Sequence, residues 1–386
     1  MSIAFQRSWS TSDIELYRKT IIRFIDEHVT PDDEAARQRG HVGHELWRTA
    51  GELGLLCTDI PEAWGGLGGD FRHEAVFYEE MARRALSGMN TSVHSIVAHY
   101  VLNHGTDEQK RRWLPRLISG EMVGAIAMTE PAAGSDLRGI RTHATRTAEG
   151  WVLNGSKTFI SNGYLAGLVL IVAKIDSAEH TPVSRPKLSI FAVQTQARKG
   201  FRVGRLLDKV GLKAQDTAEL FFDDLPVTPD ELLGGYEGQG MHQLMADLPY
   251  ERLIIAVMAI AAMEGAFEAT LSYVKEREAF GQALVQFQTI KHRLAELATE
   301  IKVGRAFVDR CVQDMLLGTL DTATASMAKL WASEAQGRVI DACVQLFGGY
   351  GYMNEYLVAR LYADARVQRI YGGTNEIMKE VISRSL

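Results

Sequence analysis

Two glycine-rich segments and one arginine have the residue types that bind a planar, phosphorylated ligand. Residues 127–139 read Ala-Met-Thr-Glu-Pro-Ala-Ala-Gly-Ser-Asp-Leu-Arg-Gly, and residues 348–351 read Gly-Gly-Tyr-Gly. Small side chains there would let the backbone approach such a ligand closely. Arg277 adds a guanidinium, which pairs well with phosphate oxygens. Each feature alone also has an ordinary interpretation, because the segments are typical of turns and Arg277 lies in a charged stretch typical of a solvated helix face.

A carboxylate that could act as a base precedes a long apolar run. Glu251 follows Asp247-Leu248-Pro249-Tyr250 and comes just before the run Leu253–Met263. A positioned carboxylate can accept a proton from a substrate. The structural interpretation is that Pro249 marks a helix start or a kink. Glu251 would then be a first-turn residue favoured by the helix dipole.

Helices are expected to position these residues at both ends of the chain. Ser12–Val29 is amphipathic and ends near Pro31, and Thr106-Asp107-Glu108-Gln109 has the pattern of a capping box. Residues 61–69 contain four glycines and predict a loop. Beyond Gly240, apolar residues recur at i, i+3, i+4 spacing, which predicts a bundle of long helices. The four stretches are Tyr250–Glu276, Thr289–Leu317, Thr322–Leu346 and Asn354–Arg366.

Between residues 121 and 229 the pattern changes to that of short strands. Gly139–Thr147 and Trp151–Asn154 flank a turn at Glu149-Gly150, which predicts a hairpin. Further short apolar runs are separated by Gly, Pro and Asp, and Glu179–Lys187 is expected to be a loop. These runs are Leu168–Ala173, Leu188–Val193 and Ala218–Phe222. Closely spaced short strands predict a compact β domain.

The composition excludes several classes of protein. With 386 residues the chain exceeds the roughly 250–300 residues at which single cores stop growing, so two or three domains are expected. A net charge of −6 gives no reason to expect nucleic acid as a partner, and no apolar run approaches the ~20 residues of a membrane span. Cys57, Cys311 and Cys343 lie far apart, which predicts no metal site and fits a reducing compartment. The N-terminus lacks a secretory signal and predicts a cytoplasmic protein of bacterial type, although a processed chain of the mitochondrial matrix would look the same.

The motifs also occur together in the order of a known family. The segment from Thr129 to Ser135 resembles the first signature of the acyl-CoA dehydrogenases, and Gln345–Tyr352 resembles the second. Glu355, Arg360 and Asp364 follow at the family's spacing. Further segments that look like family elements are Phe159–Gly163, Arg277–Gly281 and Tyr371–Glu376.

The resemblance implies an α+β fold with three parts. These are an N-terminal helical domain (1–122), a middle β-barrel-like domain (123–236) and a C-terminal four-helix bundle (237–386). It also implies a homotetramer.

FAD is the cofactor that the resemblance implies. Thr129 and Ser161 would contact the flavin ring, with Ser161 near the hydride-accepting nitrogen, and Phe159 would cover the face opposite the substrate. The second signature and its surroundings would bind adenosine and pyrophosphate, partly for the FAD of a neighbouring subunit. The expected cofactor-binding residues are Ile126, Met128, Thr129, Gly134, Ser135, Phe159, Ile160, Ser161, Arg277, Phe280, Gln288, Gln345, Leu346, Phe347, Gly348, Gly349, Thr374, Asn375 and Glu376.

The family carries its catalytic glutamate at one of two positions. Many members have it in a Tyr-Glu-Gly-Thr motif, where this chain reads Tyr-Gly-Gly-Thr with Gly372 at the vacated position. Long-chain-type and isovaleryl-type members carry it on a C-terminal helix, and the matching residue is Glu251. The resemblance to the long-chain type therefore implies that Glu251 is the base. The backbone N–H of Gly372, with a ribityl hydroxyl of FAD, would bind the thioester oxygen, and Glu376 is the competing carboxylate.

The implied reaction is α,β-dehydrogenation of a saturated acyl-CoA thioester to the trans-2-enoyl-CoA, as in fatty acid β-oxidation, with electrons passed to an electron-transfer flavoprotein. Contacts to the acyl-CoA are expected from Ser135, His242, Pro249, Tyr250 and Arg252. Asn90–Ala98, rich in small side chains, could line an acyl pocket or serve close helix packing.

Three other functions remain open from the sequence. An acyl-CoA oxidase would pass its electrons to oxygen, but oxidases of the related family are usually much longer than this chain. A flavoprotein relative could bind FAD without dehydrogenating a substrate, and Glu251 is the feature against it. A helical interaction protein without flavin would be colourless when purified.

Overall fold

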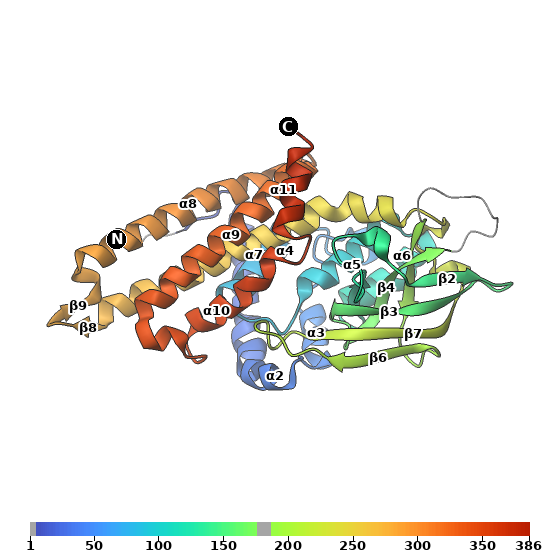
Figure 1. The fold of residues 1–386 in the computed structure, drawn as a ribbon, viewed down its shortest axis with the longest axis horizontal. Coiled ribbons are helices and arrows are strands. Elements are labelled where there is room, and N and C mark those ends of the chain that lie inside the picture. Colours follow the sequence, from blue (N-terminus) through green and yellow to red (C-terminus); the bar gives the residue numbers. More distant parts are fainter. Residues whose placement is uncertain (1–4, 176–186) are drawn as a thin grey trace.

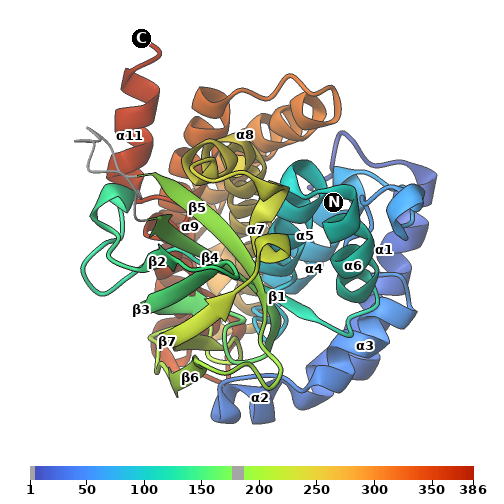
Figure 2. The same cartoon turned by 90° about the vertical axis from the view of Figure 1, so that its right-hand side faces the viewer.

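The computed structural model describes residues 5–175 and 187–386 and has three parts in chain order. A group of helices comes first, a sheet follows, and long helices end the chain (Figure 1). The sheet lies at one end of the molecule, the long helices extend away from it, and the N-terminal helices pack beside the sheet (Figure 2). The expected loop Glu179–Lys187 lies outside the described residues except for Lys187.

Six α-helices form the N-terminal part. They are α1 (Ser12–Phe24), α2 (Asp33–Arg39), α3 (His44–Glu52), α4 (Phe71–Arg83), α5 (Thr91–His104) and α6 (Asp107–Ile118). Residues 25–32 continue α1 as a π-helical and a 3-10 turn, so the helical path runs past Pro31 rather than ending there. The capping box is confirmed, because Thr106 Oγ1 accepts from Gln109 N at 3.3 Å and Gln109 Oε1 accepts from Thr106 N at 3.0 Å.

The middle part is one seven-stranded mixed sheet. Its strands are β1 (Val123–Ala127), β2 (His143–Arg146), β3 (Trp151–Ser161), β4 (Ala166–Ile175), β5 (Leu188–Gln194), β6 (Phe201–Leu206) and β7 (Thr217–Val227). The predicted hairpin is β2–β3, with Arg146 opposite Trp151, although β2 begins four residues later than expected. β4 pairs in parallel with β1 and β2 and antiparallel with β5.

The C-terminal part contains α7 (Gly240–Glu276), the short hairpin β8 (Glu278–Ala279) and β9 (Gln282–Ala283), α8 (Gln288–Leu316), α9 (Thr322–Phe347), α10 (Leu357–Ala365) and α11 (Asn375–Ser383). The prediction that a helix starts near Pro249 was wrong, because α7 begins at Gly240 and Pro249 lies inside it. A proline inside a helix removes one backbone hydrogen bond, and contacts to neighbouring elements can outweigh that loss. α11 was not predicted as a separate helix.

The buried side chains form two clusters. The larger one is continuous through the N-terminal and C-terminal helices, which meet where α4 and α5 pack on α7. The smaller one fills the inside of the sheet and includes Leu153, Phe191 and Phe222. The two helical parts therefore share one core, to which β4 and β5 add side chains such as Leu170 and Ile190, and other buried residues of the sheet form the second cluster.

Among the described residues, α7 is the one helix whose length and composition would allow it to cross a membrane. Its most apolar window is 83% buried inside the protein. A helix that is apolar all round is expected at the centre of a large core as well as in a membrane. α7 lies at the centre of the molecule, where it contacts α4, α5, α8 and α9.

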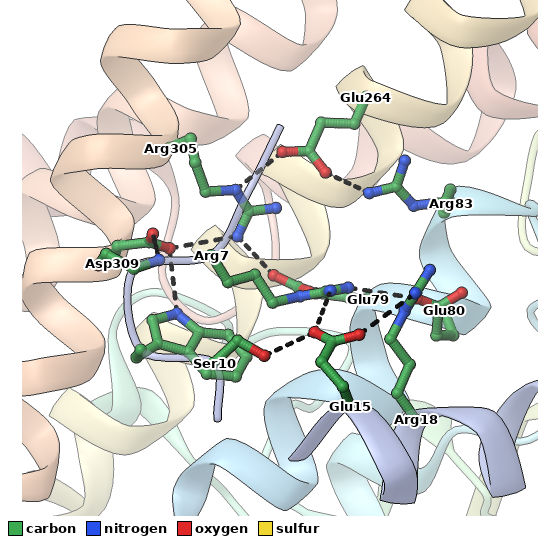
Figure 3. A network of polar contacts seen from close by, with 12 residues as sticks. Arg7, Ser10, Glu15, Arg18, Glu79, Glu80, Arg83, Glu264, Arg305 and Asp309 are labelled. Carbon is green, nitrogen blue, oxygen red and sulfur yellow. Dashed lines mark hydrogen bonds and ion pairs between the residues drawn. The ribbon is translucent and has the colours of Figure 1, made fainter. Parts of the chain in front are cut away.

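A buried network of charges joins α4, α7 and α8 (Figure 3). Glu79 on α4 accepts from Arg305 on α8 at 2.5 Å and also pairs with Arg7. Arg305 donates its Nε to Glu264 on α7 at 2.8 Å, and Glu264 pairs in addition with Arg83. Buried carboxylates are stable only when they are paired, and each of these two has two arginines.

Residues 5–10, here called the N-terminal strap, cross the helices at this network. Besides the Arg7 pair, Ser8 N donates to Asp309 Oδ2 at 2.6 Å and Trp9 Nε1 donates to Asp309 Oδ1 at 3.0 Å. Trp9 is buried. The strap is therefore bound to α8, a helix far along the chain.

Candidate active site

Glu251 lies in the interior of α7 and is buried, with 8% of its surface exposed. Its Oε1 accepts a hydrogen bond from the Tyr100 hydroxyl on α5 at 3.0 Å. Burial raises the pKa of Glu251 to about 7; the charge of Asp247 adds to the rise, and the Tyr100 bond and Arg252 oppose it. A carboxylate that titrates near neutrality is well suited to act as a general base.

The turn of α7 before Glu251 is anchored to α5. Asp247 Oδ1 accepts from Asn103 Nδ2 at 2.7 Å, and Asp247 Oδ2 contacts His104 Nε2 at 2.7 Å. Asp247 and Glu251 are four residues apart and lie on the same helix face. Asn103 and His104 of α5 therefore fix this turn of α7, and Tyr100 of the same helix holds the Glu251 carboxylate itself.

Gly372 lies in the loop before α11 and faces the same part of α7. A Cβ placed on it would lie 2.4 Å from Cδ1 of Ile255, which is one turn after Glu251, and its φ is +64°. Both the close approach and the left-handed backbone require glycine here. Within residues 5–175 and 187–386 no hydrogen bond uses the Gly372 N–H, so this donor is free, in a loop that contacts the turn of α7 after Glu251.

The competing carboxylate, Glu376, has a different environment. It lies exposed in the first turn of α11, and backbone hydrogen bonds at the helix start, together with Thr374, lower its pKa. An exposed group with a lowered pKa is a weak base. The geometry therefore favours Glu251.

The other residues expected at the substrate lie in different settings. Arg252 is buried and its Nη1 donates to Ser326 Oγ on α9 at 2.9 Å. Tyr250 is buried against His99, with ring centroids 4.2 Å apart. Pro249 is half-buried, whereas His242 and Ser135 are exposed. Of these five residues, His242 and Ser135 are therefore the most open to solvent.

The residues expected at the flavin ring lie together near the ends of β1 and β3. Thr158 N donates to Thr129 O at 2.9 Å, and Gln215 Nε2 donates to Ser161 Oγ at 2.9 Å. Because Gln215 donates to the Ser161 oxygen, the Ser161 proton is free to point toward a ligand. Ile126 and Met128 are half-buried on β1 and just after it, and the Ile160 side chain is buried in the sheet core.

Phe159 has the exposure expected of a residue that covers a planar ring. It lies at an irregularity in the pairing of β3 with β7, has a φ of +60° and is 67% exposed. A bulge re-aims a side chain, and a positive φ is a strained conformation for a bulky residue. Gly134 lies in the open loop nearby, where an added Cβ would meet no atom within 4 Å. These features fit a planar cofactor against this side of the sheet.

The expected adenosine and pyrophosphate residues lie at the other end of α7. Arg277 and the segment Gln345–Gly349 line an open groove of about 590 Å³, together with Tyr273, Leu284, Ile290, Tyr350 and Met353. Gln288 is exposed at the start of α8, and Phe280 is 96% exposed at the tip of the β8–β9 hairpin with a φ of +54°. Twenty-six residues of helix, roughly 39 Å, separate Arg277 from Glu251. Figure 1 shows this hairpin at the end of the molecule away from the sheet.

The last three expected cofactor residues form the start of α11. Thr374 caps the helix by accepting from Ile377 N at 3.3 Å. The Asn375 side chain is buried and bonds to Lys329, Ser333 and Glu334 of α9. Asn375 is therefore engaged with α9 and not open to a ligand.

Several residues of the site were not identified from sequence: Tyr100, Ile255, Gln215, Lys157 and Lys329. Of these, Lys329 had a usable signal, because it lies in a helix rich in small residues, among them Ala325, Ala328 and Ala332, and a charged residue buried there must find partners. The other four are recognisable only when α5, α7 and the sheet are in place.

Comparison with known proteins agrees with this arrangement. Family models match residues 11–121 as acyl-CoA dehydrogenase N-terminal domain, 125–225 as its middle domain and 238–386 as its C-terminal domain. The long-chain specific acyl-CoA dehydrogenase, mitochondrial, of Rattus norvegicus is 49% identical over 385 residues, which are 100% of this chain and 88% of that protein.

Solved structures agree as well. The crystal structure of an acyl-CoA dehydrogenase from Geobacillus kaustophilus superposes with a TM-score of 0.93 at 42% identity, over 98% of this chain and 99% of that one. A glutaryl-CoA dehydrogenase from Mycobacterium smegmatis, solved in complex with FADH2, has a TM-score of 0.89 at 26% identity over 97% and 95% of the two chains. Since the three family models together cover nearly the whole chain, this protein belongs to the acyl-CoA dehydrogenase family, whose members are FAD-dependent oxidoreductases.

Proposed function

We propose that this protein removes one hydrogen each from Cα and Cβ of a saturated acyl-CoA and so forms the trans-2-enoyl-CoA. One observation carries the proposal: Glu251 is buried, is bonded to Tyr100 and has its pKa raised to about 7 by burial, and the Gly372 loop contacts Ile255 on the next turn of the same helix. The position that many family members fill with their base is a glycine here. Glu251 therefore takes the role of the base.

Glu251 accepts the α-proton on its carboxylate, the Tyr100 hydroxyl holds that carboxylate, and Asp247 ties the preceding turn of α7 to α5. Gly372 N–H donates to the thioester oxygen, where negative charge develops as the proton leaves. When bound, FAD supplies the hydride acceptor that no side chain provides. Ser135 and His242, which are exposed, contact the CoA portion, and buried Tyr250, half-buried Pro249 and Arg252 shape the acyl side.

FAD binding by this chain is supported by two separate groups of residues. Thr129, Ser161 and Phe159 would hold the flavin ring, and Thr374 and Glu376 would lie on the flavin side as well. The groove of Arg277 and Gln345–Gly349, with Phe280 and Gln288, binds adenosine and pyrophosphate. Because roughly 39 Å of helix separates Arg277 from Glu251, this groove serves the FAD of a neighbouring subunit. The proposed assembly is accordingly a homotetramer.

The electron acceptor that fits the resemblance is an electron-transfer flavoprotein, and the process it serves is fatty acid β-oxidation. Relatives include one protein named as mitochondrial and one from a bacterium; we propose a cytoplasmic enzyme of bacterial type, with the mitochondrial matrix as the alternative for a processed chain. We divide the chain at residues 1–122, 123–236 and 237–386.

The test is an anaerobic single turnover of the FAD-loaded protein with a panel of saturated acyl-CoA thioesters. A good substrate should bleach the flavin absorbance, and reoxidation should be fast with an electron-transfer flavoprotein and slow with oxygen. Glu251→Gln should retain FAD but lose bleaching by about 10²–10⁴-fold, whereas Glu376→Gln is the matched control and should bleach far faster than Glu251→Gln. A colourless protein, or equal bleaching by Glu251→Gln and the parent, contradicts the proposal. Rapid peroxide formation would indicate an oxidase.

A further inference from the structure

Lys329, on α9, is fully buried and bonds the loop that carries Gly372. Its Nζ donates to the Gly373 carbonyl oxygen at 2.8 Å and to Asn375 Oδ1 at 2.8 Å. Within the described part of the chain no carboxylate lies close enough to form an ion pair with it. Burial and the charge of Arg252 lower the pKa of Lys329 to about 8, against the opposing charges of Glu376 and Glu334. A buried ammonium without a directly bonded carboxylate is unfavourable, so the two hydrogen bonds of Lys329 must offset that cost.

The loop that Lys329 contacts has little rigidity of its own. Gly372 and Gly373 both have a left-handed φ, +64° and +86°. Consecutive glycines have the most conformational freedom to lose. Upstream, the loop is fixed by the Tyr371 N–H bond to Val367 O at 3.1 Å. Downstream, Lys329 makes the one hydrogen bond to Gly373 O found in residues 5–175 and 187–386.

Lys329 is part of a row of polar side chains on one face of α9. Ser326, Lys329 and Ser333 are three and four residues apart, so they share a face. Ser326 accepts from Arg252, the neighbour of Glu251, at 2.9 Å, and Ser333 Oγ accepts from Asn375 Nδ2 at 3.0 Å. α9 thus contacts both α7, at the residue next to Glu251, and the start of α11.

We propose that Lys329 is a positioning residue for the dehydrogenation: it fixes the Gly372–Gly373 loop so that the Gly372 N–H meets the thioester oxygen while Glu251 takes the α-proton. This inference rests on the proposed function. Misplacing such a donor by about 1 Å can lower a rate by roughly 10²-fold. The effect should appear in the proton-transfer step rather than in substrate or FAD binding.

A second buried lysine provides a matched control. Lys157, on β3, is equally buried, and its Nζ donates to Met128 O at 3.0 Å and to Glu130 Oε1 at 2.8 Å. Burial lowers its pKa to about 8 as well. It anchors the backbone before Thr129 on the flavin side. Replacing each lysine by methionine removes a buried ammonium and its hydrogen bond to a backbone carbonyl oxygen, that of Gly373 in one case and that of Met128 in the other.

The experiment compares the FAD-loaded parent with Lys329→Met, Lys157→Met and Ser333→Ala. Exchange of the α-protons is followed by NMR in D₂O on an acyl-CoA whose β-carbon is replaced by sulfur, because this probe can lose the α-proton but cannot give up a hydride. Lys329→Met should slow that exchange about 10–100-fold, with affinity for the probe and FAD content within threefold of the parent. Lys157→Met should instead weaken FAD binding. Ser333→Ala keeps both Lys329 bonds and loses the contact to Asn375, so it should slow exchange less than Lys329→Met does.

Amide hydrogen exchange of residues 370–374 separates this proposal from the proposed function. It should be at least tenfold faster in Lys329→Met than in the parent, and unchanged in Lys157→Met, whether or not any acyl-CoA is a substrate. A parent that exchanges no α-proton overturns the proposed function alone. If Lys329→Met keeps the parent's amide exchange and α-proton exchange, the positioning role is overturned. If Lys329→Met does not fold, Lys329→Gln, which retains one donor, decides by the same measurements.

Discussion

Glu79 and Glu251 are both buried glutamates, yet their surroundings push their protonation in opposite directions. Burial alone would raise both pKa values, but at Glu79 the charges and hydrogen bonds of Arg305 and Arg7 outweigh it, so the pKa lies below its ordinary value. Glu251 has a tyrosine hydroxyl as its hydrogen-bond donor, and its pKa rises to about 7. The first carboxylate is a permanent anion, and the second can exchange a proton at neutral pH.

The difference follows from how many cations reach each carboxylate. In the network of Figure 3, arginines from the N-terminal strap, α4 and α8 converge on Glu79 and Glu264. Near Glu251 the closest arginine, Arg252, is directed to Ser326 instead. The same residue type thus serves stability in one place and chemistry in the other.

The largest effect is expected when the catalytic carboxylate is removed from position 251 and placed at position 372 instead. Glu251→Ala should slow flavin reduction about 10²–10⁴-fold. Adding Gly372→Glu should restore part of the rate, but its Cβ would lie 2.4 Å from Ile255 Cδ1 and its backbone would be strained. Ile255→Val removes that one atom, so the triple variant should be faster than the double.

Two single variants serve as controls for this experiment. The flavin-reduction rate of every variant is measured by stopped-flow flavin bleaching. Ile255→Val alone should stay close to the parent, and Gly372→Glu alone should be slow, because two close carboxylates raise one pKa. A triple variant no faster than Glu251→Ala would show that the Gly372 position does not reach the substrate.

At Glu79 the glutamine substitution should affect stability instead. Glu79→Gln leaves Arg305 and Arg7 buried without their shared anion, and breaking a buried pair in this way lowers the free energy of unfolding by about 3–5 kcal/mol. Denaturant unfolding measures the loss, and flavin reduction per bound FAD should remain near the parent's. Combining it with Arg305→Met should lose less than the sum of the single changes. A loss below about 1 kcal/mol would mean that the network is dispensable.

A glutamine at position 251 should instead raise the free energy of unfolding at high pH, relative to the parent. The folded pKa of about 7 exceeds the unfolded value of about 4.3, so the contribution of Glu251 to stability is complete below the unfolded pKa and is lost as pH rises through 7. Glu251→Gln has no such loss. Relative to the parent it should gain about 1–3 kcal/mol of unfolding free energy between pH 5 and pH 8.5. A pH-independent difference between the two proteins would contradict a raised pKa.

The smallest effect is expected for the hydrogen bond between Tyr100 and Glu251. This bond lowers the pKa of Glu251 against the effect of burial, so Tyr100→Phe should raise it further. The pH at which the flavin-reduction rate falls off on the acid side (the acid limb of the pH profile) should rise by about one unit, which corresponds to ~1.4 kcal/mol. Asn103→Leu, which breaks the contact to Asp247 instead, serves as the comparison. A limb that moves to lower pH would contradict the assignment of Glu251 as the titrating base.

Local patterns predicted much of the fold, and contacts between distant segments account for what was missed. The Thr106 cap and the β2–β3 hairpin depend on neighbours in sequence and were predicted. The predicted start of α7 was ten residues too late, because α5 holds Asp247 and the helix continues through Pro249. For the site, the resemblance indicated Glu251, but its Tyr100 partner depends on which faces of α5 and α7 meet.

The N-terminal strap also sets the order in which the chain can be completed during synthesis. Trp9 and its partner Asp309 are 300 residues apart. At roughly 5–20 residues per second a ribosome needs about 15–60 s to add that length. For this interval Ser8 and Trp9 have been made while their partner Asp309 on α8 does not yet exist, and Glu79, although it can already meet Arg7, lacks its second arginine, Arg305. The shared helical core can therefore close only late in translation, and the first residues made are among the last to find their place.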